Sequence, residues 1–99
     1  MKRTVSKLKT GDYIAFAYSY FRIEDDTQII VEKILDVTED GRFLVCFLWG
    51  HHSVSEYIKK EEVLAIGNMA TGEHGLKGWT GKFDLIQPDN KFIKENLKP

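Results

Sequence analysis

The sequence has one cysteine, no long apolar run and almost no net charge. Cys46 stands alone, which excludes an internal disulfide and a cysteine-based zinc cluster within one chain. No apolar stretch approaches the length of a membrane-spanning helix, and none follows the basic N-terminus as in a secretory signal. Fourteen lysines and arginines face fifteen acidic residues, a balance that weakens the case for a general polyanion binder. We therefore expect a cytoplasmic domain without a membrane span.

The sequence also lacks a complete catalytic or cofactor-binding motif. A phosphate-binding loop fails around Gly81-Lys82, because Leu76 replaces its first glycine and Phe83 its magnesium-binding hydroxyl. No Gly-x-Ser-x-Gly elbow is present, and Cys46 lies in a predicted buried strand, where an activated thiolate is not expected. The neighbouring side chains of His51-His52 point apart and do not readily share a metal. We predict a protein that is not an enzyme, with no catalytic residues, metal or cofactor.

The composition and patterning predict a single, mostly β domain over residues 1–99. Hydrophobic residues make up 42% of the chain and aromatic residues 12%, enough for a folded core. Alternating apolar residues predict short strands, and Asp40-Gly41 is a strong hairpin signal. The run Arg42–Trp49 is apolar on both faces, which predicts a central strand covered on both sides. The expected strands are 12–21, 28–37, 42–49, 53–58 and 63–66, with a short turn over 59–62 before the last.

The chain after residue 66 has a different character. Residues 67–81 form a glycine-rich loop in which glycine recurs at every third position from 72 to 81, and the pattern leaves open whether it is functional or simply mobile. Strand character returns over 79–87. Asp89 is the expected N-cap of a short helix, whose apolar stripe of Phe92, Ile93 and Leu97 packs back on the strands. Residues 82–99 thus add a strand and a C-terminal helix to a core over 8–66.

The strand and turn pattern of residues 8–66 resembles the small barrels of the SH3-like and Tudor-like superfamily. The opening Leu8–Ala15, the segments Val31–Val37 and Asp40–Phe47, and the closing Tyr57–Ile66 carry this resemblance. It implies a barrel of about five strands that binds peptides. In some members an aromatic cage holds a methylated lysine or arginine. Tyr18 or Tyr20 and Phe47 would then be cage walls, although Trp49 stands where the family has an acidic residue.

Aromatic residues near strand ends are the best candidates for a binding site. Tyrosine and tryptophan bury a large area at low entropic cost, which suits them to interfaces. We predict a non-catalytic module, a small regulator or inhibitor, that docks on another protein; strand addition at an exposed edge is an equally available mode. The predicted contact residues are Tyr18, Tyr20, Phe47, Trp49 and Trp79.

The alternative is a nucleic-acid-binding small barrel. Its support is local: the first nine residues carry four positive charges and no negative charge, and two lysines flank Trp79 in the glycine-rich loop. The oligomeric state stays open at this stage. The residues of this alternative are Lys2, Arg3, Lys7, Lys9, Lys77 and Lys82.

Overall fold

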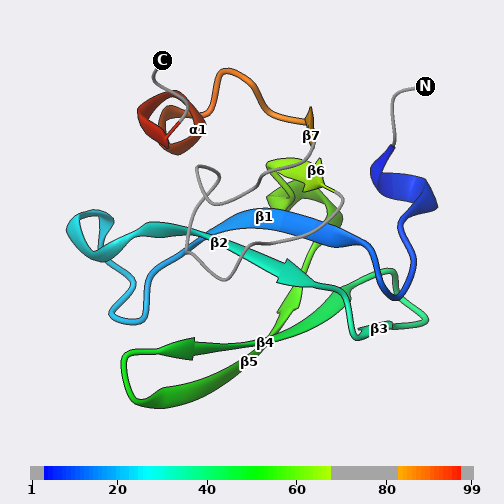
Figure 1. Cartoon of the computed structure of the whole chain (residues 1–99), viewed down its shortest axis with the longest axis horizontal. Coiled ribbons are helices and arrows are strands. Elements are labelled where there is room, and N and C mark those ends of the chain that lie inside the picture. Colours follow the sequence, from blue (N-terminus) through cyan, green and yellow to red (C-terminus); the bar gives the residue numbers. More distant parts are fainter. Residues whose placement is uncertain (1–3, 68–82, 97–99) are drawn as a thin grey trace.

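A computed structural model describes residues 4–67 and 83–96 of the chain, and it confirms a mostly β protein (Figure 1). The strands form two antiparallel sheets, and one short α-helix follows them. The predicted glycine-rich loop began at residue 67, but Gly67 is the last residue of strand β6, and the rest of that loop lies outside the described residues. The elements in chain order are η1 (Val5–Lys7), β1 (Tyr13–Tyr18), η2 (Glu24–Asp26), β2 (Gln28–Lys33), β3 (Asp36–Val37), β4 (Phe43–Trp49), β5 (His52–Ile58), η3 (Lys60–Glu62), β6 (Ala65–Gly67), β7 (Phe83–Leu85) and α1 (Lys91–Asn96).

The larger of the two sheets joins segments that are distant in sequence. Its strand order is β2-β1-β6-β7, so β1 lies between β2, which follows it in sequence, and β6, which comes about fifty residues later. Ala15 faces Val31 on one side and Ala65 on the other. The smaller sheet, β3-β4-β5, is instead a local meander. Its β4–β5 hairpin is in register from Phe43 opposite Ile58 to Trp49 opposite His52.

The strand predicted over 28–37 is interrupted, because the chain passes from the large sheet to the small sheet in the middle of it. Ile34 is fully buried, and its N–H donates a 2.8 Å hydrogen bond to the carbonyl of Asp12 beside β1. The next residue, Leu35, donates at 2.8 Å to the carbonyl of Leu44 in β4. Two adjacent residues therefore bond to different sheets. The prediction of one continuous strand was wrong because alternation does not reveal where a strand bends.

The principal core lies between the two sheets. Inward residues of both sheets meet there with the buried residue that precedes β1 and one that precedes β6. Phe16 and Phe47 contact edge to face, with ring centroids 5.8 Å apart. The buried members are Leu8, Ile14, Phe16, Ile30, Ile34, Phe43, Val45, Phe47, Ile58, Val63 and Ile66.

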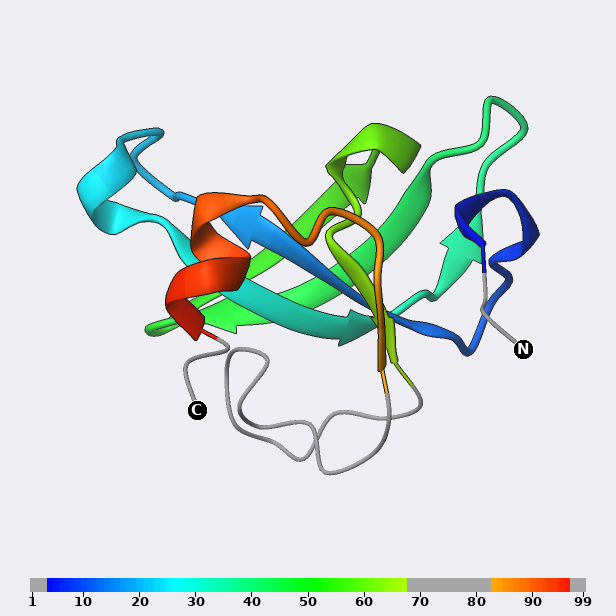
Figure 2. The ribbon, with the colours of Figure 1, turned by 90° about the horizontal axis from the view of Figure 1, so that it is seen from above.

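A second apolar cluster covers the other face of the large sheet. Helix α1 packs there through Ile93, which is 1% exposed, and Figure 2 shows the helix lying beside β1 and β2. The predicted N-cap of this helix was wrong by one residue. The side-chain oxygen of Asn90, not of Asp89, accepts the N–H of Phe92 at 2.9 Å. The buried residues of this cluster are Ala15, Ile29, Val31, Leu64, Ala65 and Ile93.

The outer face of the small sheet is exposed in the described structure, which corrects the prediction that β4 is covered on both sides. Leu48 is 61% exposed, and Cys46 is exposed instead of buried. The Cys46 thiol lies 3.2 Å from the hydroxyl of Ser55 on the neighbouring strand. Helix α1 packs on the large sheet, so β4 has only one covered face among the described residues.

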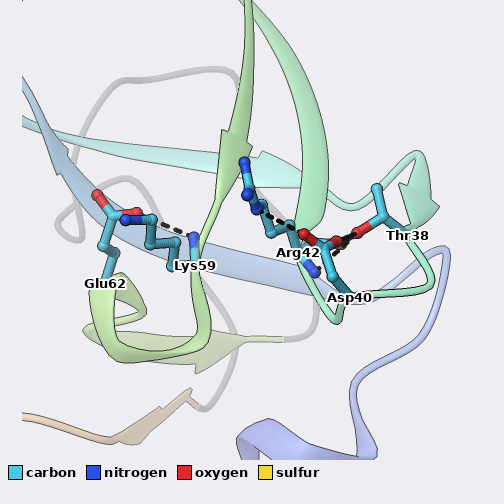
Figure 3. A network of polar contacts seen from close by, with 5 residues as sticks. All are labelled: Thr38, Asp40, Arg42, Lys59 and Glu62. Carbon is cyan, nitrogen blue, oxygen red and sulfur yellow. Dashed lines mark hydrogen bonds and ion pairs between the residues drawn. The ribbon is translucent and has the colours of Figure 1, made fainter.

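The β3–β4 turn confirms the Asp-Gly hairpin signal, and Figure 3 shows the polar contacts around it. Gly41 has a φ of +83°, a conformation that a side chain disfavours. The Asp40 carboxylate accepts from the Thr38 hydroxyl and pairs with the Arg42 guanidinium at 2.9 Å. The Thr38 bond is the main cause that holds the pKa of Asp40 below its ordinary value, and Arg42 adds to it. These local contacts fix the turn.

Candidate functional site

Aromatic rings from β1 and β4 meet at one end of the molecule. The Tyr18 ring contacts the Phe47 ring edge to face at 4.9 Å between centroids. It also contacts the Trp49 ring in the same manner at 5.2 Å. Phe47 is 6% exposed and belongs to the core, whereas Tyr18 and Trp49 are half-buried. The three rings therefore form a continuous path from the core to the surface.

A second ring pair lies beside this path. Tyr20, in the loop after β1, stacks on His52 at the start of β5, with centroids 5.4 Å apart and ring planes 16° apart. Tyr20 is 42% exposed and contacts the exposed ring of Phe21. We call the set Tyr18, Tyr20, Trp49 and His52 the aromatic end.

The loop that carries Tyr20 is held by its own hydrogen bonds. The Asp26 carboxylate accepts the Phe21 N–H at 3.2 Å, and the Ser19 hydroxyl accepts the Ile23 N–H at 2.9 Å. An ion pair between Glu24 and Lys91 links the loop to helix α1. Polar side chains that satisfy backbone groups in this way restrict a loop to few conformations. The exposed rings are therefore presented on an ordered support.

Two open hollows flank the aromatic end. The first has a volume of about 460 Å³ and lies between β2 and the β4–β5 turn. The second, of about 480 Å³, lies between the end of β1 and β5. Trp49 and His52 line the first, and Tyr18 and Tyr20 line the second. A concave surface with aromatic walls can bury a projecting side chain of a ligand.

The second hollow carries charge beside its rings. Glu56 and Arg22 contribute to its lining. Burial raises the pKa of the Tyr18 phenol above its ordinary value of 10.0, and the Glu56 carboxylate is the next largest cause. The hollow therefore offers a carboxylate and a guanidinium, one of each sign, beside its aromatic faces.

The structure brings together four of the five aromatic residues predicted to contact a partner, and three of them are exposed or half-buried. Tyr18 and Trp49 touch, and Tyr20 lies beside them through its contact with His52. Phe47 supports these rings from the core, and with 6% exposure it offers little surface to a partner. The fifth residue, Trp79, lies outside the described residues.

Sequence reasoning missed two members of the site, His52 and Glu56. The signal for His52 was available in the hairpin. Gly50 has a φ of +62°, as expected for the first residue of a two-residue hairpin turn. A two-residue turn over Gly50 and His51 places Trp49 opposite His52. Glu56 gave no such signal, because its place beside Tyr18 depends on how the two sheets are packed.

Of the six basic residues of the nucleic-acid alternative, the structure describes Lys7 and Lys9. Lys7 ends η1 and Lys9 precedes β1, at the opposite end of the molecule from the aromatic end (Figures 1 and 2). The Lys9 ammonium lies 4.0 Å from the Asp12 carboxylate. Residues 2, 3, 77 and 82 lie outside the described residues.

Within residues 4–67 and 83–96, no group of three histidine, cysteine or acidic side chains is arranged to hold a metal ion. None of the helices described is long and apolar enough to span a membrane. Comparisons with protein-family models, with curated proteins and with solved structures gave no match to this chain.

Proposed function

We propose that the protein is a non-catalytic interaction module that docks on another protein through its aromatic end. The observation that carries this proposal is the meeting of Tyr18, Tyr20, Trp49 and His52 between two open hollows. Aromatic side chains anchored on one side and exposed on the other are typical of binding hot spots. A projecting side chain of the partner enters a hollow and packs against the rings. A small regulator or inhibitor of a larger protein would act in this way.

We further propose that the two sheets form an SH3-like barrel. Three features support it: the chain passes from one sheet to the other between the consecutive strands β2 and β3, η3 precedes the last barrel strand, and that strand, β6, pairs with β1. Buried contacts between inward faces of both sheets fill the space that such a barrel encloses. In this arrangement the aromatic end lies at one mouth of the barrel, where loops meet.

Substitutions at the aromatic end test the proposed function. Tyr20→Ala and Trp49→Ala each remove a ring that borders a hollow. Tyr57→Ala is the matched control, because Tyr57 is also exposed (52%) but lies on the outer face of the small sheet. The readout is capture of a protein partner by each immobilised variant, with far-UV circular dichroism as the check on folding.

We expect the two aromatic-end variants to lose the partner that the unsubstituted protein and the Tyr57 variant retain. Equal capture by all four proteins would refute the proposed site.

Nucleic-acid binding stays a prediction, and it has its own test. Fluorescence anisotropy of labelled single- and double-stranded DNA and RNA at about 50 and about 200 mM salt measures affinity and its salt dependence. A binder that neutralises phosphates loses affinity steeply over this range, whereas a module that docks on proteins gives flat traces.

A further inference from the structure

Strand β5 is a long edge strand. Its seven residues, His52–Ile58, pair with β4 on one side. In the part of the chain that the structure describes, no strand pairs with its other side. The opposite edge of the same sheet, β3, has only two residues. The β4–β5 hairpin lies at the lower border of the molecule in Figure 1, where β5 presents a row of backbone donors and acceptors.

This edge has few of the features that usually keep edge strands apart. Charged side chains, above all lysine, and also proline, bulges and very short length prevent edge strands from pairing with other chains. The one acidic residue of β5 is Glu56. The sequence of β5 contains no lysine, arginine or proline. Its register with β4 is continuous over all seven residue pairs, so it has no bulge. The edge is therefore competent to accept another strand.

The outer face of the β4–β5 hairpin, next to this edge, carries no charge; Asp36 of β3 lies on the same face beyond β4, opposite Leu44. Leu44, Cys46 and Leu48 of β4 face Tyr57, Ser55 and Ser53 of β5 on the outer side of the small sheet. Charged residues make up 29% of the whole chain, so an uncharged face of six residues is a departure from the average surface. An added strand would extend this face without burying a charge on it.

The sequence of β5 is self-complementary in one antiparallel register. A two-fold axis normal to the sheet keeps the outer faces of both copies on the same side of the joined sheet. Each residue of β5 therefore faces a residue whose side chain points to the same side of the sheet as its own. With the axis at Val54, Glu56 faces His52 of the second copy, and this pair occurs twice. With the axis at Glu56, two carboxylates face each other; with the axis at Ser55, Glu56 faces Val54. Of these three registers, only the one at Val54 places an imidazole opposite a carboxylate, and it places no two carboxylates opposite each other.

We infer that the chain forms a two-fold homodimer in which β5 pairs antiparallel with β5 of a second copy, centred on Val54. The two small sheets then join into one continuous sheet. The imidazole of His52 donates to the Glu56 carboxylate of the other copy. Because Glu56 lines the second hollow, the dimer brings His52 of the second copy to the border of that hollow. This inference does not depend on the proposed function.

A charge exchange tests both the dimer and its register. His52→Glu places two carboxylates face to face in both pairs, and Glu56→Lys places lysine opposite histidine. When the two variants are mixed, the heterodimer contains two different pairs. In one, the carboxylate introduced at position 52 faces the ammonium introduced at position 56; in the other, the original Glu56 faces the original His52. Sedimentation velocity from about 1 µM to about 1 mM protein measures the dimer Kd, and native mass spectrometry identifies the heterodimer. Gln28→Glu, on the exposed edge of β2, is the control.

We expect a concentration-dependent dimer for the unsubstituted and Gln28→Glu proteins, and a Kd raised about tenfold or more by His52→Glu. We expect the mixture to form the heterodimer in preference to either homodimer. A protein that stays monomeric throughout, a dimer indifferent to His52→Glu, or a mixture without heterodimer would each overturn the inference. Trp49→Ala leaves both charge pairs in place, so loss of partner capture and loss of the dimer are distinguishable.

Discussion

The free energy of unfolding of Trp49→Ala shows how much the aromatic end contributes to the stability of the fold. Trp49 is half-buried, and its main ring contact is the edge-to-face contact with Tyr18 at 5.2 Å. Such a contact contributes about 0.5–1.5 kcal/mol beyond area burial. Partial burial of the indole adds about 1 kcal/mol, since full burial of a large apolar side chain contributes roughly 1.5–3 kcal/mol. We therefore expect the free energy of unfolding to fall by about 2 kcal/mol.

Phe43→Ala is the comparison, because Phe43 is 1% exposed and belongs to the core between the sheets. Truncation of a fully buried phenylalanine costs about 3–5 kcal/mol. Urea denaturation followed by far-UV circular dichroism gives both free energies without relying on tryptophan fluorescence. A Trp49→Ala cost equal to that of Phe43→Ala would refute the reasoning. Loss of partner capture in that variant would then reflect unfolding.

Three further predictions concern the phenol, a turn and the helix. Because the pKa of Tyr18 is raised in the folded protein, its contribution to stability is complete below pH 10 and is lost as the pH rises through the folded pKa. Ultraviolet titration should show the Tyr18 phenol ionising above its ordinary pKa of 10.0, and Glu56→Gln should lower that pKa only in part, because burial is the larger cause. Gly41→Ala should cost about 1 kcal/mol in urea denaturation because φ is +83°; no cost would mean that the turn relaxes. Ile93→Ala should cost about 2–5 kcal/mol in the same assay, and a smaller cost would show that α1 is not part of the core.

Local patterns in the sequence predicted the strands and most of the turns. Alternation located β1, β4 and β5 to within about three residues, and Asp40-Gly41 marked the β3–β4 hairpin. These features depend on neighbouring residues, so one sequence contains their full signal. The choice of Asp89 over Asn90 as helix cap failed for a related reason. Both residue types cap helices well, and the local sequence does not decide between them.

Which faces of the two sheets are covered could not be predicted from the sequence, because the covering segments are distant along the chain. β4 is apolar on both faces, yet only its inner face is covered in the described structure, and Leu48 is exposed. β1 and β2 are covered on both faces, because α1 packs on the large sheet. The candidate site shows the same limit. Tyr18 and Trp49 were predicted from their places at strand ends, whereas Glu56 joins them only when the sheets pack together.

The central place of β1 in the large sheet sets the order in which a nascent chain can fold as it leaves the ribosome. The meander β3-β4-β5 is contiguous and can form as soon as its residues have emerged. β1 can pair with β2 early, but its other edge stays unpaired until Ala65 emerges to pair with Ala15, and the outer face of β2 stays bare until Ile93 emerges. During that interval Ile29 and Val31 are exposed to water and to chaperones. Release from a chaperone should therefore follow the synthesis of α1.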